Sequence, residues 1–352
     1  MKAIAKAVTK AIALYSGGLD SILACRMVMR QGIEVLAVQF ITPFFLEHLA
    51  AGADAHCREV AGKYGIALRL EDISGDYLHM LRQPAHGFGK NFNPCIDCKI
   101  LMMRRARQIM EEIGASFLVS GEVLGQRPMS QRRDTLAVIE RDAGVRGLLV
   151  RPLSARLLNP TLVETNGWLR RDELGDLAGR GRAKQIALAK EYGIGDYPMP
   201  AGGCVLTDPI QARRLRRVHD GALPFAAASM GVDDFRLLQL GRQFLLPGGG
   251  WLILGRDQGE NDRIETLAQA DDALLRPDDR PGPAALLRRA LHCYADEHRR
   301  DGDLRRAAGL IARYAKKNPA QPEALVRCLL ASDIIHLKAS AIDDVLCQSW
   351  LL

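Results

Sequence analysis

The sequence predicts an α/β protein, in which a doubly wound parallel sheet is followed by a second, smaller α+β domain. An apolar run at residues 11–15 is broken by two glycines and followed by a helix-competent stretch that reaches about residue 30. A second apolar run at 34–40 completes a strand, helix, strand order, which favours parallel pairing within one sheet. Two short apolar runs on either side of three glycines at 248–250 predict strands of the second domain.

Length and composition are those of a globular protein with about two domains. The chain has 352 residues, of which 48% are hydrophobic and 25% charged, and this excludes fibrous and disordered classes. We place the boundary after residue 210, which gives domains of residues 1–210 and 211–352. No stretch of about 18 uncharged apolar residues is present, so we expect no membrane span. Lys6 and Lys10 interrupt the stretch that most resembles a signal peptide, and we therefore expect a cytoplasmic location.

Positive charge is concentrated in the middle of the chain. Lys and Arg outnumber Asp and Glu by 7 overall, and residues 99–217 alone contain 21 basic and 13 acidic residues, a surplus of 8. Such a band suits a polyanionic partner, because Lys and Arg side chains that contact phosphates release condensed counterions. A solvated basic face without a partner is the alternative.

The segment from Ser16 to Ser21, with the sequence SGGLDS, has the composition of a phosphate-binding loop. Gly17 and Gly18 allow the backbone to approach a phosphate closely, and the two serine hydroxyls lie near the positive end of the predicted helix. Asp20 can orient a metal ion on a triphosphate or cap the helix. The lysine of the GxxxxGK(S/T) loop is missing, which disfavours cleavage at the γ-phosphate. The alternative is a chance Gly-Gly turn.

Three of the eight cysteines lie in predicted loops, where a reactive or metal-binding thiol is more expected than a packed one. Cys95 and Cys98 open a predicted helix, where the helix dipole favours the thiolate, and Cys204 is surrounded by glycines and prolines. Three thiolates suit a cluster with one open iron, or a dithiol with a separate cysteine that carries sulfur. A structural zinc site with His86 or His56 as the fourth ligand is the alternative. The other five cysteines fit ordinary packed thiols.

Taken in order, the segments SGGLDS, GKNFNPCIDCK, SGEVLGQRPMSQ, RPLS and PAGGC resemble the tRNA-thiolating branch of the PP-loop ATP pyrophosphatases, whose fold is that of the adenine nucleotide alpha hydrolases. NPCIDC is similar to 2-thiouridine synthetases, and SGEVLGQ to 4-thiouridine synthetases. The resemblance covers residues 8–210. It implies that ATP adenylates a uridine carbonyl oxygen in tRNA, that pyrophosphate leaves, and that a sulfur nucleophile then displaces AMP.

The resemblance also implies roles for individual residues. The three cysteines would hold a 4Fe-4S cluster with an open iron, which we favour because no rhodanese-like extension follows Cys204. In the alternative, Cys204 carries a persulfide and Cys95 or Cys98 resolves it. Sulfide or a sulfur donor protein would supply the sulfur, and a homodimer is one expected arrangement. ATP, with Mg2+, is expected to contact Ser16, Gly17, Gly18, Leu19, Asp20, Ser21, Gly121 and Gln126, and catalysis is expected to depend on Asp20, Cys95, Cys98 and Cys204.

The second domain is expected to replace an RNA-binding region at the front of the chain. Nothing before residue 8 corresponds to the N-terminal tRNA-binding part of 4-thiouridine synthetases. The string GGGWLILGRDQGEND is similar to the RNA-binding domain of NFACT proteins, and predicts a glycine-rich hairpin followed by a helix from about residue 258. Residues 284–352 continue with amphipathic helical patterns that indicate packing. We expect RNA contacts from Arg180, Arg182, Lys184, Arg213, Arg214, Trp251 and Arg256.

Two other classes of function are compatible with parts of this pattern. A PP-loop ligase that acts on a small molecule would use SGGLDS but would not need three loop cysteines. A non-catalytic RNA-binding protein would use the basic band and the second domain alone. A solvent-facing start of a basic helix would account for Arg180, Arg182 and Lys184 without any partner.

Overall fold

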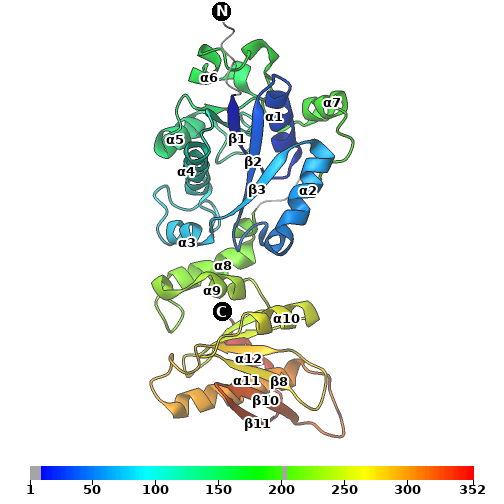
Figure 1. Ribbon diagram of the computed structural model, residues 1–352. Helices are drawn as coiled ribbons and strands as arrows, with labels where there is room; N and C mark the ends of the chain where they lie inside the picture. The colour runs from blue at the N-terminus through cyan, green and yellow to red at the C-terminus, as the bar shows by residue number, and fades with distance from the viewer. Residues whose placement is uncertain (1–8, 200–203) are drawn as a thin grey trace, which may run out of the picture. The chain divides into compact units, whose positions relative to one another are not determined.

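The computed structural model describes residues 9–199 and 204–352, and the chain divides into two compact units, Met1–Asp208 and Pro209–Leu352 (Figure 1). Each unit has its own sheet and its own hydrophobic core. The residues Pro200 to Gly203, which we expect to shape the loop before Cys204, lie outside the described part of the chain. No helix in the described ranges is long and apolar enough to cross a membrane.

The N-terminal unit contains the predicted parallel sheet. Its five strands lie in the order β3-β2-β1-β4-β5, and every neighbouring pair is parallel. The strand order reverses on the two sides of β1, which confirms the doubly wound class. The strands are β1 (Lys10–Leu14), β2 (Glu34–Ile41), β3 (Ala67–Asp72), β4 (Phe117–Ser120) and β5 (Leu149–Val150).

Helices pack on both sides of this sheet. In Figure 1, α1 and α2 lie on one side, and α4 and α5 lie on the other. The central strand β1 is apolar after Lys10, and Ile12 in it is completely buried, as expected for a strand covered on both faces. The helices are α1 (Leu19–Met29), α2 (Ala53–Tyr64), α3 (Ser74–Arg82), α4 (Cys95–Glu112), α5 (Arg133–Ala143), α6 (Leu162–Thr165) and α7 (Ala183–Glu191).

The carboxyl ends of β1 and β4 bring two loops into contact. The two strands are paired in parallel, so the loop that starts at Ser16 and the loop that starts at Gly121 leave the same edge of the sheet. A Cβ atom on Gly121 would lie 2.7 Å from the backbone nitrogen of Ser21. Gly17 has a φ of 78°, in the left-handed region that favours glycine. Both glycines are therefore required by the backbone itself.

The C-terminal unit is built on a six-stranded antiparallel sheet in the order β11-β10-β8-β9-β7-β6. The predicted hairpin is present, since β6 and β7 pair antiparallel, and helix α10 follows from Gln258. The strands are β6 (Arg242–Leu245), β7 (Trp251–Leu254), β8 (Ala273–Pro277), β9 (Ala285–Arg288), β10 (Ala324–Leu330) and β11 (Asp333–Ala339). The helices are α8 (Pro209–His219), α9 (Val232–Leu238), α10 (Gln258–Thr266), α11 (Glu297–Tyr314) and α12 (Asp344–Ser349).

The prediction of helical patterns for residues 284–352 is correct only in part. Helix α11 is present and buries Leu304, Ala307 and Leu310 against the sheet core. The segments on either side of it form β9 and the hairpin of β10 and β11 instead. In β10, buried and more exposed residues alternate, which is the period of a strand with one covered face.

Candidate active site

The loop from Ser16 to Ser21 is curled onto the N-terminus of α1. The hydroxyl of Ser21 donates to the carbonyl oxygen of Gly18 at 2.7 Å, and the backbone N–H of Ile22 donates to the same oxygen at 3.2 Å. Gly18 is the N-cap of α1 and no side chain caps the helix, so the capping alternative for Asp20 is wrong. The backbone N–H of Ser21 also donates to the carbonyl oxygen of Gly18, at 3.0 Å, so the N–H groups of Leu19 and Asp20 are the ones left for a phosphate.

Asp20 is held from the neighbouring loop and keeps one oxygen unpaired. Its Oδ2 accepts a hydrogen bond from Nε2 of Gln126 at 2.9 Å. Its Oδ1 is buried and has no hydrogen-bond partner among the described residues. A buried carboxylate oxygen without a partner is costly unless a cation or donor occupies the site. The donor chemistry at Asp20 therefore fits a Mg2+ ion bound together with a triphosphate.

Two further polar side chains, which the sequence patterns do not single out for this role, lie beside the same loop. Gln39, at the end of β2, is 2% exposed, and its Oε1 lies 2.8 Å from Nε2 of His56 on α2. A Cβ atom on Gly17 would lie 3.4 Å from Nε2 of Gln39. This pairing of His56, and that of His86 with Asp142 at 3.0 Å, gives both histidines carboxylate or amide partners, which does not support the structural zinc alternative.

The three predicted thiols converge on one buried tyrosine. Cys95 and Cys98 lie in the first turn of α4, as predicted, and Tyr77 of α3 forms a hydrogen bond with Cys98. Burial raises the pKa of Tyr77, and the nearby sulfur atoms of Cys98, Cys204 and Cys95 raise it further. The thiols of the two sequence segments are thus within electrostatic range of one another.

The individual thiols differ in their surroundings. Burial raises the pKa of Cys98 to about 12, although the neighbouring ammonium group of Lys99 opposes this shift. Burial also raises the pKa of Cys204. Cys98 is therefore a protonated thiol at neutral pH. Among residues 9–199 and 204–352, no three His, Cys, Asp or Glu side chains are arranged to hold a metal ion.

The loop before α4 holds the two cysteine segments together. Nδ2 of Asn93 lies 3.2 Å from Sγ of Cys95, and Nδ2 of Asn91 donates to the carbonyl oxygen of Thr207 at 2.5 Å. Thr207 in turn donates through its backbone N–H and its hydroxyl to the carbonyl oxygen of Cys204, at 2.8 Å and 2.6 Å. Two asparagines of one loop thereby fix both cysteine segments. A Cβ atom on Gly89 would lie 2.7 Å from Asn93, so this loop also needs its glycine.

A buried ion network connects the thiol helix to the phosphate loop. Glu122, which follows Gly121, accepts from Nε of Arg151 at 3.0 Å, and Nζ of Lys99 lies 3.7 Å from its other oxygen. Burial disfavours the charged form of Glu122, but Lys99 and Arg151 outweigh it and lower the pKa of the carboxyl. Arg151 also pairs with Glu140 of α5. The residue after Cys98 is therefore tied to the residue after Gly121.

In the N-terminal unit, the predicted RNA-contacting residues lie at the surface near the start of α7. Arg180 and Lys184 are exposed, and Arg182 is the N-cap of the helix. Nζ of Lys184 forms an ion pair with Asp176 at 3.2 Å. The structure does not connect these three side chains to the thiols through any described contact.

In the C-terminal unit, the structure corrects the prediction for Trp251. This residue is completely buried, and its indole N–H donates to Oε1 of Gln243 at 2.7 Å, so it belongs to the core and cannot stack on a base. Arg214 donates to the carbonyl oxygens of Leu238 and Gly241, which gives it a structural role. Arg213 is exposed.

Arg256 is the remaining predicted RNA contact of this unit. It lies just before α10 and forms an ion pair with Glu260 of that helix, and its side chain is 54% exposed. The guanidinium group is therefore accessible at the surface, but part of its charge is already neutralised.

Comparison with known proteins relates the two units to two families. Residues 7–156 match the family model of the thiamine biosynthesis protein ThiI, and residues 241–350 match the NFACT protein RNA binding domain. The chain combines a ThiI-like region with an NFACT-type RNA-binding region. Both resemblances predicted from the sequence are confirmed. Asp20, Cys95, Cys98, Gly121 and Gln126 lie within the ThiI-like region, whereas Cys204 lies beyond it.

Curated relatives of the ThiI-like region carry the name probable tRNA sulfurtransferase. The protein from Thermoanaerobacter sp. (strain X514) is 32% identical over 144 residues, which are 41% of this chain and 36% of that protein. The protein from Methanothermobacter thermautotrophicus is 34% identical over 124 residues, 33% of this chain and 30% of that protein. The chain thus spans about a third of the length of these relatives. A crystal structure of a 4-thiouridine synthetase–RNA complex with bound ATP aligns with a TM-score of 0.37 and 22% identity, over 66% of this chain and 52% of that one.

Proposed function

We propose that this chain is an ATP-dependent tRNA uracil sulfurtransferase. The observation that carries the proposal is the junction at residues 121–122, where the phosphate loop and the thiol helix meet. Gly121 lies against the backbone of Ser21, and Glu122 is paired with Lys99, the neighbour of Cys98. An ATP pyrophosphatase without sulfur chemistry has no need for thiols at this place.

In the proposed reaction, the phosphate loop positions ATP for attack at its α-phosphorus. The N–H groups at the start of α1 bind phosphate oxygens, and Gln126 holds Asp20 so that Oδ1 faces the site. A Mg2+ ion on this oxygen would neutralise negative charge on the leaving pyrophosphate. The uracil carbonyl oxygen forms a bond to the α-phosphorus, and the bond between the α- and β-phosphates breaks. The carbonyl oxygen thereby becomes part of a good leaving group, AMP.

Sulfur then replaces AMP at the activated carbon of uracil. In the persulfide route, the terminal sulfur of a Cys204 persulfide attacks this carbon, AMP leaves with the former carbonyl oxygen, and a second thiol releases the product by forming a disulfide with Cys204. Cys95 or Cys98, both in the first turn of α4, supplies this second thiol. Sulfide attacks the disulfide at the sulfur of Cys204, which regenerates the persulfide and releases the resolving thiol. Alternatively, a dithiol reductant restores both thiols and a donor protein transfers a persulfide sulfur to Cys204.

The 4Fe-4S route stays a prediction from the sequence resemblance. The proximity of Cys95, Cys98 and Cys204 supports it, but the described side chains do not form a three-ligand metal site, so we derive no step through a cluster. Measuring the iron and inorganic sulfide in protein purified without oxygen distinguishes the 4Fe-4S route from the persulfide route. About four irons per chain, lost in Cys95→Ala, would establish the cluster. Full activity without iron would leave the persulfide route.

tRNA as the partner is supported by the NFACT-type region and by the names of the relatives. A cytoplasmic location and a homodimer stay predictions. The proposal is tested by incubating the full chain with unmodified tRNA, ATP and sulfide, and measuring thiouridine by mass spectrometry of the nucleosides.

We expect thiouridine with the wild-type chain and at least a 100-fold loss in Asp20→Ala and in Cys204→Ala, since each removes a reacting group. Cys57→Ala, on α2 of the same unit, is the matched control and should retain activity. Unchanged thiolation in both variants would refute the proposal. Pyrophosphate exchange that responds to a small acid or amine rather than to tRNA would favour a PP-loop ligase.

A further inference from the structure

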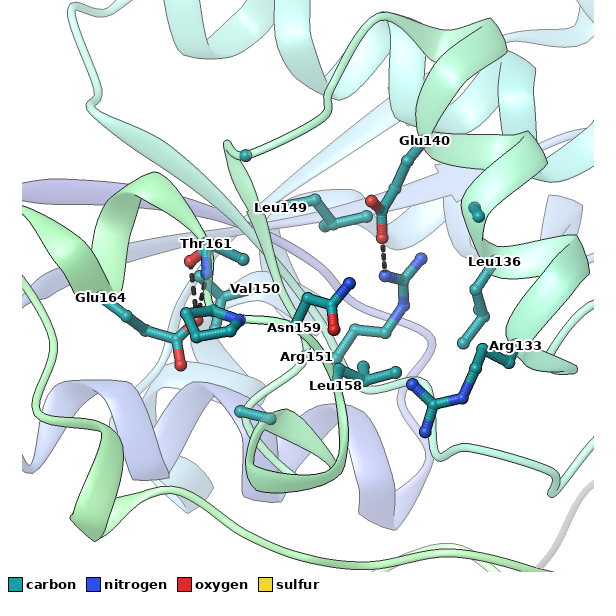
Figure 2. A pocket seen from close by; sticks show the side chains of 14 residues that line it. Arg133, Leu136, Glu140, Leu149, Val150, Arg151, Leu158, Asn159, Thr161 and Glu164 are labelled. Atoms are coloured by element: carbon teal, nitrogen blue, oxygen red, sulfur yellow. Dashed lines mark hydrogen bonds and ion pairs between the residues drawn. The ribbon is translucent and has the colours of Figure 1, made fainter.

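A cavity of about 190 Å³ lies beside β5, at the edge of the parallel sheet. Figure 2 shows the side chains that line it, which come from α5, from β5 and from the segment through residues 155–164. Leu136, Leu149 and Leu158 supply apolar wall, and Arg133, Arg151 and Asn159 supply hydrogen-bond donors. A mixed wall of this kind suits a flat polar ring better than a purely apolar ligand.

Arg151 lines this cavity and has one donor group without a partner among the described residues. The residue is 3% exposed, its Nε donates to Glu122 and its Nη1 donates to Glu140. Its Nη2 is buried and finds no hydrogen-bond partner among the residues that the structure describes. Buried N–H groups are almost always paired, so this group is free to bind an acceptor atom of a ligand.

Arg133 adds positive charge at the rim. Its Nη2 donates to the carbonyl oxygen of Leu157 at 2.7 Å, a neutral partner that leaves the charge of the guanidinium in place. The two carboxylates of the lining are already neutralised, because Glu140 pairs with Arg151 and Glu164 pairs with Arg171. The cavity is therefore suited to a ligand that carries both acceptor atoms and a negative charge.

The cavity borders a second hollow at the start of α5. A second, more open hollow is lined by Leu124, Gly125 and the first turn of α5, and shares Arg133 and Ala137 with the cavity. Gly125 is followed by Gln126, which donates to Asp20. The hollow beside the cavity is thus lined by the chain neighbour of the residue that holds Asp20.

We propose that this cavity binds a nucleotide of the RNA strand that neighbours the target uridine. The base lies between the leucine side chains, with its carbonyl or ring acceptors toward Arg151 and Asn159, and its phosphate contacts Arg133. Proteins commonly read single-stranded RNA by removing a base from its stack and bonding to its polar edge. This inference rests on the proposed sulfurtransferase function and adds a second subsite to it.

The test measures the affinity of the full chain for tRNA and for ATP in variants of the cavity. Ala137→Phe places a ring at the exposed entrance, and Arg133→Ala removes the rim charge. We expect each to weaken tRNA binding about tenfold, as loss of one base or phosphate contact does, with ATP affinity within about twofold of wild type. Arg133→Ala should also reduce the salt slope of binding by about 0.7. Arg141→Ala, which removes another surface arginine from α5, is the control and should leave tRNA affinity unchanged.

The outcomes distinguish failure of the proposed sulfurtransferase function from failure of the RNA subsite alone. If the wild-type chain neither binds nor thiolates tRNA, the proposed function fails and the inference fails with it. If the wild-type chain thiolates tRNA and both cavity variants bind tRNA normally, the inference alone is overturned. Titration with uridine monophosphate tests whether the cavity is a site for free nucleotides and not for RNA. Binding of the monophosphate that is lost in Ala137→Phe, with tRNA affinity unchanged, would also overturn the RNA subsite.

Discussion

The glycine-rich loops of the two units look alike in the sequence, and their backbone N–H groups have different partners. In the N-terminal unit, the loop around Gly17 and Gly18 leads into α1 with no carboxylate cap. In the C-terminal unit, the N–H groups of Gly248 and Gly250 both donate to the carboxylate of Asp303, each at 3.0 Å. Asp303 is completely buried. A glycine loop is therefore a candidate anion site only where the protein does not already supply an internal anion.

The same contrast separates a predicted site residue with an unpaired polar atom from one that belongs to the core. Asp20 keeps an oxygen without a partner, whereas Trp251 is fully buried and uses its indole N–H for Gln243. An unsatisfied polar atom at a conformationally constrained loop indicates a ligand, and a satisfied one indicates packing. The following changes test this distinction.

The largest effect is expected at the internal anion of the C-terminal loop. Asp303→Ala leaves the donors of Gly248, Gly250 and Tyr294 without their acceptor in a buried place. We expect the free energy of unfolding of this unit to fall by roughly 3 kcal/mol. Urea unfolding followed by circular dichroism measures it, with Asp301→Ala on the same helix as the control. A loss of RNA binding at unchanged stability would show that this loop is a functional site instead.

A smaller effect is expected where the two loops of the N-terminal unit touch. Gly121→Ala places a Cβ atom 2.7 Å from the Ser21 backbone and must displace the phosphate loop. We expect a loss of roughly 2 kcal/mol in ATP binding, or about 30-fold in Kd, with tRNA binding unchanged. Calorimetric titration with ATP measures it. Gly75→Ala on α3, where a Cβ atom meets no atom within 4 Å, is the control and should bind ATP like the wild type.

The smallest effect is expected at Trp251. Trp251→Phe keeps an aromatic ring and removes only the hydrogen bond to Gln243. We expect a loss of about 1 kcal/mol in the free energy of unfolding and unchanged affinity for tRNA. Trp168→Phe is the matched control, because it makes the same replacement at a partly exposed position of the other unit. A marked fall in tRNA affinity with Trp251→Phe would restore this residue to the RNA-binding surface.

The parallel sheet and the thiol helix were predictable because their signals are local. The apolar run before Gly17 and the helical spacing after Cys98 depend on neighbours in the chain. The hairpin of β10 and β11 was missed because its short apolar runs fit a helix as well as a strand, and only pairing with β8 decides between them.

The site residues that the sequence did not predict are brought together by contacts between residues distant in the chain. Tyr77 is more than a hundred residues from Cys204, and Asn91 holds Thr207 across a similar separation. Gln39 and Arg151 are buried polar residues near the carboxyl ends of β2 and β5, and their contacts are visible only when the neighbouring loops are in place. Their residue types could have raised them as candidates, because polar side chains directly at the end of a parallel strand often face a ligand.

The central claim is that one site joins phosphate activation to sulfur transfer, and the fate of the uracil oxygen tests it most directly. The full chain is given ATP, sulfide and tRNA in which the target uracil carbonyl carries 18O, and the released AMP and pyrophosphate are analysed by mass spectrometry. The account predicts one 18O atom in AMP and none in pyrophosphate for each thiouridine formed. Thiouridine formed together with unlabelled AMP would contradict it.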